Sequence, residues 1–143
     1  MRVLALDYGS ARCGCAVSDP TGTIASPIEP VLRPATRRGI GALAGLVAAF
    51  SVEHVVVGLP LSLSGQDTDQ TRESRAFAER LARRLGPGIE VELYDERFTT
   101  RMAQRLGDAR SAEDSRAAAY LLEGWLARHA ASAEAQQSVG ETD

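Results

Sequence analysis

The sequence predicts an α/β protein whose mixed sheet has three antiparallel strands followed by two parallel strands, flanked by helices. Short apolar or alternating segments, separated by turn residues, fill the first 26 residues. After Pro27, buried strand patterns alternate with helical patterns, which is typical of parallel strands joined by helices. At 143 residues, the chain has the length of one domain with a sizeable core.

Three short strands are expected to open this domain. The apolar run Val3–Leu6 indicates a buried strand. Arg12–Ser18 alternates between two faces and indicates a second strand, and Asp19–Gly22 has the composition of a type I turn. Thr23–Ser26 is then expected to run back as a third strand, which the proline at position 27 should stop.

The later segments alternate between helix and strand. Thr36 is a candidate N-cap for a helix whose apolar residues recur at helical spacing as far as Phe50. Val55–Val57 indicates the next buried strand, and the helical pattern that follows ends at Gly86. Ile89–Leu93 alternates as the last strand.

These assignments predict how the strands pair. We expect Val3–Leu6, Val55–Gly58 and Ile89–Tyr94 to be parallel neighbours in one sheet. The segments Arg12–Ser18 and Thr23–Ser26 should be antiparallel to the first of them.

Two helices are expected near the end of the chain, over Thr100–Leu106 and from Ser111 to about Arg128. Residues 1–129 then form the predicted domain. Residues 130–143 lack apolar periodicity, so we expect them to be a disordered tail.

Composition excludes some classes of protein. No apolar run approaches the roughly 20 residues that span a bilayer, and the first residues do not resemble a signal peptide, so we expect a cytoplasmic protein without a membrane partner. Cys13 and Cys15 are the only cysteines. Their spacing on one strand disfavours a disulfide, and we expect two buried, reduced side chains.

Charge decides little about the partner. The net charge is −3, but three of the 19 acidic residues, Glu134, Glu141 and Asp143, lie beyond His129 and all 16 basic residues lie before it. All 16 are arginine, whose planar fork suits phosphate recognition.

Three carboxylates are the candidate catalytic and metal-binding residues. Asp7 ends the first predicted strand and Glu96 follows the last, and the carboxyl ends of parallel strands meet at one edge of a sheet. Asp114 has two interpretations. With Ser111 it matches a capping box, but it also extends the helical stripe that leads to Trp125, where a charge is costly unless it is paired or bound to a metal.

An all-carboxylate site predicts the cofactor and the reaction class. Converging acids repel each other unless cations share the site. Hard oxygen ligands favour Mg²⁺ or Mn²⁺ over zinc. Two such ions can activate water and stabilise the leaving oxygen of a phosphodiester, so we expect a hydrolase acting on nucleic acid.

Four other residues are candidate substrate-binding residues. Arg12 and Arg97 flank the acids and are suited either to clamping phosphate oxygens or to neutralising the acids. Gly9 permits a sharp turn after Asp7, and Gly58 gives room either for substrate backbone or for a strand-end turn. The neighbouring Asp95 alternates with Leu93, which favours a structural role facing away from Glu96.

Four motifs, spread in order from Met1 to about His129, resemble those of the YqgF/RuvX family. They are Asp7-Tyr8-Gly9-x-x-Arg12-x-Gly14-x-Ala16-x-Ser18-Asp19, Val57-Gly58-Leu59-Pro60, Asp95-Glu96-Arg97-x-Thr99-Thr100 and Asp114-x-x-Ala117-Ala118. Members of this family are described as pre-16S rRNA nucleases and as Holliday junction resolvases. The resemblance implies a ribonuclease-H-like fold and implies that Asp7, Glu96 and Asp114 are the metal-binding catalytic acids. It also implies maturation of the 5′ end of 16S rRNA in ribosome biogenesis.

The family's pattern is not matched everywhere. Ala11 stands where relatives often carry lysine, and Leu106–Asp114 is short, with Arg110 as its one basic residue. Both departures lower the expected affinity for the phosphate groups of a nucleic acid.

Several alternatives stay open. The substrate is either precursor or otherwise structured rRNA or a four-way DNA junction, and a resolvase that cuts two strands symmetrically would be a two-fold dimer. The oligomeric state, monomer or homodimer, is not readable from the chain. A non-catalytic RNA- or ribosome-associated factor is a further alternative, favoured by the reduced basic character and opposed by the intact acids. An ATP-binding protein of the sugar-kinase and actin class is disfavoured, because it needs two such domains.

Overall fold

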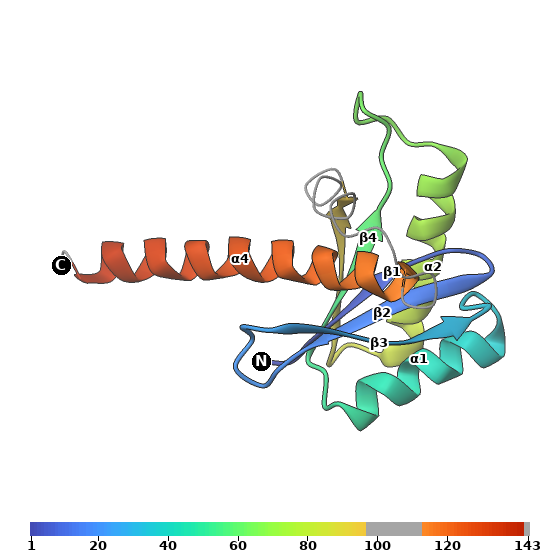
Figure 1. Cartoon of the computed structure of the whole chain (residues 1–143), viewed down its shortest axis with the longest axis horizontal. Coiled ribbons are helices and arrows are strands. Elements are labelled where there is room, and N and C mark those ends of the chain that lie inside the picture. The colour runs from blue at the N-terminus through green and yellow to red at the C-terminus, as the bar shows by residue number, and fades with distance from the viewer. Residues whose placement is uncertain (97–112, 142–143) are drawn as a thin grey trace.

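The protein is a three-layer α/β/α structure, seen here in a computed structural model (Figure 1). The structure describes residues 1–96 and 113–141, and in the last helix it describes side chains for residues 115–130. The predicted helix over Thr100–Leu106 and the candidate residue Arg97 lie outside the described residues. No helix in the described part of the chain is long and apolar enough to cross a membrane.

The sheet has five strands in the order β3-β2-β1-β4-β5. The central strand β1 (Val3–Asp7) is antiparallel to β2 (Arg12–Ser18) and parallel to β4 (His54–Leu59), which is in turn parallel to β5 (Glu90–Asp95). The predicted fold class and the three parallel neighbours are confirmed. β3 (Ala25–Leu32) is antiparallel to β2 and therefore runs in the same direction as β1. The expectation that the third strand opposes the first was wrong, because two successive reversals restore the direction.

β3 begins later than the predicted strand Thr23–Ser26. The Asp19 carboxylate accepts hydrogen bonds from the backbone N–H groups of Thr23 and Ile24, at 2.7 Å each. These bonds hold both residues in the turn. A hydrogen bond from the Thr21 hydroxyl, together with these backbone bonds, keeps the pKa of Asp19 well below its ordinary value. The side chain of Asp19 therefore extends the turn and delays the strand.

β3 also continues through Pro27, where the sequence analysis ended it, and through Pro30. β3 is an edge strand, where a residue without an N–H group is tolerated. Its register with β2 shifts between Cys13 and Cys15, so an irregularity accommodates the second proline. Edge position, which the local sequence does not encode, explains the longer strand.

Two helices, α1 (Arg37–Ala49) and α2 (Asp69–Leu85), cover one face of the sheet. Thr36 caps α1 as predicted, because its Oγ1 accepts a hydrogen bond from the Gly39 N–H at 3.1 Å. The half of the core on this α1/α2 face is made by apolar side chains of both helices and the sheet, among them Leu4, Leu6, Cys13, Cys15, Ile40, Leu43, Val55, Val57, Phe77 and Leu81. Both cysteines are buried and free, as predicted.

The start of α2 is fixed to the loop after β4. Thr68 and Thr71 form a capping box, and the buried Thr71 hydroxyl also donates a hydrogen bond to the Pro60 carbonyl at 2.6 Å. The helix ends at Gly86, whose φ of 84° belongs to the region that favours glycine. The predicted end of this helix is confirmed.

The opposite face of the sheet is covered by α4 (Glu113–Glu141). The predicted stripe packs there on Val3, Ala5, Ala16 and Val56, through Ala118, Leu121, Leu122 and Trp125. The backbone stays helical to Glu141 and extends away from the sheet (Figure 1), whereas a helix ending near Arg128 and a disordered tail were predicted. The tail is rich in Ala, Glu and Gln, which favour helix without an apolar stripe. The domain boundary at residue 129 stays a prediction.

Candidate active site

The candidate site lies at the edge where the parallel strands end. Asp7 is the last residue of β1, and Glu96 directly follows β5. β4 lies between these two strands, and its register places Gly58 beside Tyr94 of β5. The two acids must therefore meet across β4.

Gly58 makes room for that meeting. A Cβ atom at this position would lie 2.4 Å from Glu96 Oε1 and 3.0 Å from Cγ and Cδ of the same side chain. Val56, two residues earlier on β4, packs on the α4 face, so the missing side chain of Gly58 also belongs to that face. The Glu96 side chain thus occupies the space that any other residue at position 58 would fill. This contact supports neither space for substrate backbone nor a strand-end turn, which were the two interpretations of Gly58 from the sequence.

The two acids interact directly. The carboxyl groups of Glu96 and Asp7 are joined by a hydrogen bond. Burial raises the pKa of Glu96 to about 8, and the charge of Asp7, this hydrogen bond and the charge of Asp95 contribute to the rise. The two carboxyl groups therefore oppose each other's ionisation.

Asp95 was assigned a structural role in the sequence analysis. It follows the alternation of β5, but its negative charge is one of the causes of the raised Glu96 pKa. Asp95 therefore contributes to the electrostatics of the site. The signal that could have found this is its position next to Glu96 at a strand end.

The β1–β2 turn borders the site. A Cβ atom on Gly9 would lie 2.8 Å from the Arg12 carbonyl oxygen, so the turn requires glycine there. Tyr8 stacks on Phe77 of α2 with ring centroids 4.6 Å apart, and burial raises the pKa of its hydroxyl. Arg12 is exposed at the start of β2. These contacts support a turn role for Gly9 and leave Arg12 accessible.

The start of α4 is anchored near Asp7. Ser115 Oγ accepts a hydrogen bond from the Cys15 N–H at 3.4 Å and donates one to the Ile28 carbonyl at 2.5 Å. Gly14, beside Cys15, is the residue of β2 that pairs with Asp7. The backbone of Asp114 immediately precedes Ser115 in α4. The side chain of Asp114 lies outside the described residues, so the structure brings together two of the three predicted acids and leaves the third a prediction.

The donor set of the described pair suits a hard cation. Asp7 and Glu96 present oxygen ligands, and a divalent ion would relieve the repulsion between their ionised forms. Within residues 1–96 and 115–130, no three His, Cys, Asp or Glu side chains are grouped so that they could hold a metal ion. A complete carboxylate site would therefore need a ligand from elsewhere in the chain.

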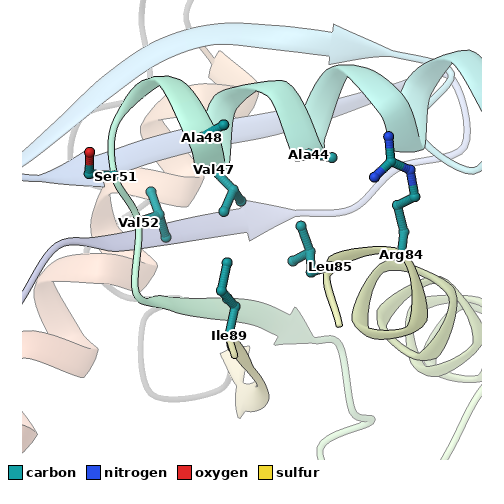
Figure 2. A pocket seen from close by; sticks show the side chains of 8 residues that line it. All are labelled: Ala44, Val47, Ala48, Ser51, Val52, Arg84, Leu85 and Ile89. Carbon is teal, nitrogen blue, oxygen red and sulfur yellow. The ribbon is translucent and has the colours of Figure 1, made fainter. Parts of the chain in front are cut away.

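Other polar features lie at the opposite edge of the sheet. Trp125 donates to the Glu92 carboxylate at 3.0 and 3.1 Å, and its ring lies between those of His54 and His129. A hollow of about 380 Å³ is also found at that edge, between the end of α1, the end of α2 and Ile89 (Figure 2). Neither feature touches Asp7 or Glu96, and the hollow is lined mainly by apolar residues.

The space at Gly58 leads to a testable prediction. Gly58→Ala should displace the Glu96 carboxyl, and misplacement of a catalytic group by about 1 Å typically costs about 100-fold in rate. Metal-dependent cleavage by the purified variant measures the effect. Gly45→Ala is the control, because nothing lies within 4 Å of a Cβ atom there and alanine favours the helix. Equal cleavage by both variants would show that the position of Glu96 does not matter.

The sequence of this chain is similar to a known protein family and to named bacterial proteins. The model of the family RuvX, described as "Holliday junction resolvase", matches residues 1–128. A protein of Myxococcus xanthus is 40% identical over 137 residues, which cover 90% of this chain and 89% of the relative. A Mycobacterium leprae protein is 41% identical over 133 residues, which cover 87% and 72% of the two chains. Both relatives are named "Putative pre-16S rRNA nuclease".

Solved structures share the fold. The structure titled "T. thermophilus RuvC in complex with Holliday junction substrate" superposes with a TM-score of 0.55 at 17% identity, covering 91% of this chain and 96% of that one. A second structure of Thermus thermophilus RuvC gives a TM-score of 0.53 over similar shares. At this level of identity the likeness concerns the arrangement of strands and helices, which confirms the predicted fold.

Proposed function

This chain belongs to the RuvX family, and from that membership we propose that it is a metal-dependent endonuclease that hydrolyses nucleic-acid phosphodiesters. The observation that carries the proposal is the pair Asp7 and Glu96, whose carboxyl groups meet at the carboxyl ends of β1 and β5. In this proposal Asp7, Glu96 and Asp114 hold Mg²⁺ or Mn²⁺ and are the catalytic acids.

The roles of the chain's own residues follow from the geometry. Bound divalent ions would supply activation of water and stabilisation of the leaving oxygen. Asp7 and Glu96 would hold these ions, and Glu96 must release its proton to do so, because a carboxyl group binds metal in its ionised form. Gly58 keeps the Glu96 side chain within reach of Asp7. Arg12 and Arg97 are proposed to orient the phosphate by charge-assisted hydrogen bonds.

We propose precursor rRNA as the substrate, cut near the 5′ end of 16S rRNA during ribosome biogenesis in the cytoplasm. The names of the relatives support this choice. The description of the matching family supports a second candidate, resolution of four-way DNA junctions. That reaction requires two symmetric cuts and therefore a two-fold dimer. The proposal for rRNA places no such demand on the oligomeric state.

A cleavage assay on a panel of substrates tests the proposal. Pre-16S rRNA fragments, single-stranded RNA and four-way DNA junctions would be incubated with the protein and Mn²⁺ or Mg²⁺. We expect metal-dependent cleavage of the precursor fragment to be at least about tenfold faster than cleavage of the junction. This ratio corresponds to a difference of about 1.4 kcal/mol in the activation free energy. Preferred cleavage of the junction would favour the resolvase. If no substrate is cut with either metal, the protein is a non-catalytic factor.

A further inference from the structure

Three segments next to the candidate site are held together in the fold. The backbone N–H of Arg33, between β3 and α1, donates to the Ala11 carbonyl in the β1–β2 turn at 2.9 Å. The guanidinium of Arg80, in the C-terminal half of α2, donates to the Ala35 carbonyl just before α1. The β1–β2 turn, the start of α1 and this part of α2 are therefore connected side by side.

This surface is rich in arginine. We define the arginine surface as five exposed side chains on these segments: Arg12, Arg33, Arg37, Arg38 and Arg80. The chain from residue 30 to residue 52 contains three of them and no acidic residue. In the described part of the chain, no carboxylate forms an ion pair with the arginines at positions 33, 37 and 38. Arg80 donates its hydrogen bond to a neutral carbonyl, and no carboxylate of the described residues forms an ion pair with it.

The position of Arg37 and Arg38 is unfavourable for the helix itself. Both lie in the first turn of α1, which has no acidic residue, although the positive end of a helix dipole disfavours cations. The other helix on the same face shows the favourable arrangement: α2 has Asp69 in its first turn and Arg83 and Arg84 in its last. The two arginines of α1 thus have no stabilising role in their own helix, which indicates a role toward a ligand.

We propose that the arginine surface continues from Arg12, which borders the cleavage site, and binds the phosphate backbone of the nucleic acid beyond that site. The inference rests on the proposed function and extends it, because it makes the substrate a structured nucleic acid several base pairs long. Asp7 and Arg12 are five residues apart, so their Cα atoms are at most about 18 Å apart, which is roughly five base-pair steps of a duplex. A duplex engaged at the acids therefore passes within reach of the first arginine. The planar, permanently charged guanidinium groups match phosphate oxygens.

The double variant Arg37→Gln/Arg38→Gln tests this inference. Binding to a 5′-labelled RNA duplex of about 20 base pairs would be followed by fluorescence anisotropy, in calcium, over a series of salt concentrations. Because each lost phosphate contact lowers the salt slope by about 0.9, we expect the slope of log K against log salt to fall by about 2. The affinity at moderate salt should fall about tenfold, and the loss should be the same for different duplex sequences, as expected for phosphate contacts.

The matched control is Arg83→Gln/Arg84→Gln. It removes the same charge from exposed positions of a helix. These positions follow Arg80 in α2, toward the edge of the sheet opposite Asp7 and Glu96, where Arg84 lies beside the hollow (Figure 2). We expect a salt slope within about 0.5 of that of the unchanged protein, because no phosphate contact is lost. The stability change should have the opposite sign in the two variants, since only the control removes cations from the favourable end of a helix.

Hydrolysis of a small diester, bis(p-nitrophenyl) phosphate, with Mn²⁺ separates this inference from the proposed function. The variant Arg37→Gln/Arg38→Gln should hydrolyse this diester at the rate of the unchanged protein, because the small diester contacts only the site of the catalytic acids. If the unchanged protein binds duplex but hydrolyses nothing, the proposed function fails while a changed slope still supports the surface. An unchanged slope in the α1 variant, or an equal change in the control, would overturn the inference and point to a partner other than nucleic acid.

Discussion

Asp7→Asn is expected to remove metal-dependent cleavage by several orders of magnitude while the folded protein keeps or raises its melting temperature. The substitution removes a charged oxygen ligand, and metal-dependent hydrolysis has no substitute for it. It also removes the negative charge that opposes ionisation of Glu96. Cleavage of the precursor fragment in Mn²⁺ and thermal unfolding monitored by circular dichroism measure the two effects. Wild-type cleavage by the variant would exclude the metal mechanism.

The same variant should change the pH dependence of stability. The folded-state pKa of Glu96 is about 8, above its ordinary value of 4.5, so the folded protein holds a proton that the unfolded chain releases. In metal-free solution this group therefore contributes a loss of stability as the pH rises from about 4.5 to about 8. We expect that decline to be smaller in Asp7→Asn, because the negative charge of Asp7 then no longer raises the Glu96 pKa. Equal declines in the two proteins would show that the acids are not coupled.

Asp95→Asn is the matched control for Asp7→Asn. It removes the same charge from the same edge of the sheet, but the alternation of β5 directs position 95 away from the face of Glu96. We expect cleavage within about tenfold of the unchanged protein, a difference of 1.4 kcal/mol or less in the barrier. A loss as large as that of Asp7→Asn would make Asp95 a member of the catalytic set.

Asp114→Asn is expected to reduce cleavage by orders of magnitude with little loss of stability. A metal ligand contributes to the reaction, and its replacement by a neutral amide keeps the size and the polar character of the side chain. If Asp114 were only the partner in a capping box, the change would instead cost about 1 kcal/mol or less of stability and leave activity near normal. Melting temperature and Mn²⁺-dependent cleavage distinguish the two results.

Ser111→Ala supplies the control for that experiment. It removes the candidate cap and no ligand, so it should lower stability by about 1 kcal/mol and spare catalysis. An Asp114→Asn protein that is less stable but fully active would assign position 114 to the cap.

The placement of Asp7 and Glu96 at one edge of the sheet could be predicted because it follows from topology. Both residues end strands that the pattern marked as parallel, and parallel strands deliver their carboxyl ends to one edge. The role of Gly58 could not be predicted in this way. It depends on the path that one side chain takes across the neighbouring strand, and the glycine alone is equally consistent with a turn or with space for a ligand.

The errors in the fold have a similar origin. The third strand was ended at Pro27 because proline interrupts a central strand, and only the complete sheet shows that β3 is an edge. The last helix was ended near Arg128 because its apolar stripe ends there, although helix propensity alone continues it. Local sequence patterns identified each helix and strand. The residues at which β3 and the last helix end could not be predicted from these local patterns.

The division of the core between the two faces of the sheet has a consequence for synthesis of the chain from its N-terminus. The strands that the structure describes and both helices of the α1/α2 face lie before residue 97, so that half of the core can close early. The other half waits for Trp125, more than 100 residues after Val3 and Ala5, which it helps to bury. Until α4 leaves the ribosome, the nascent protein carries a bare apolar sheet face. Such a surface favours aggregation and chaperone binding. Folding of this protein is therefore completed from its C-terminal side.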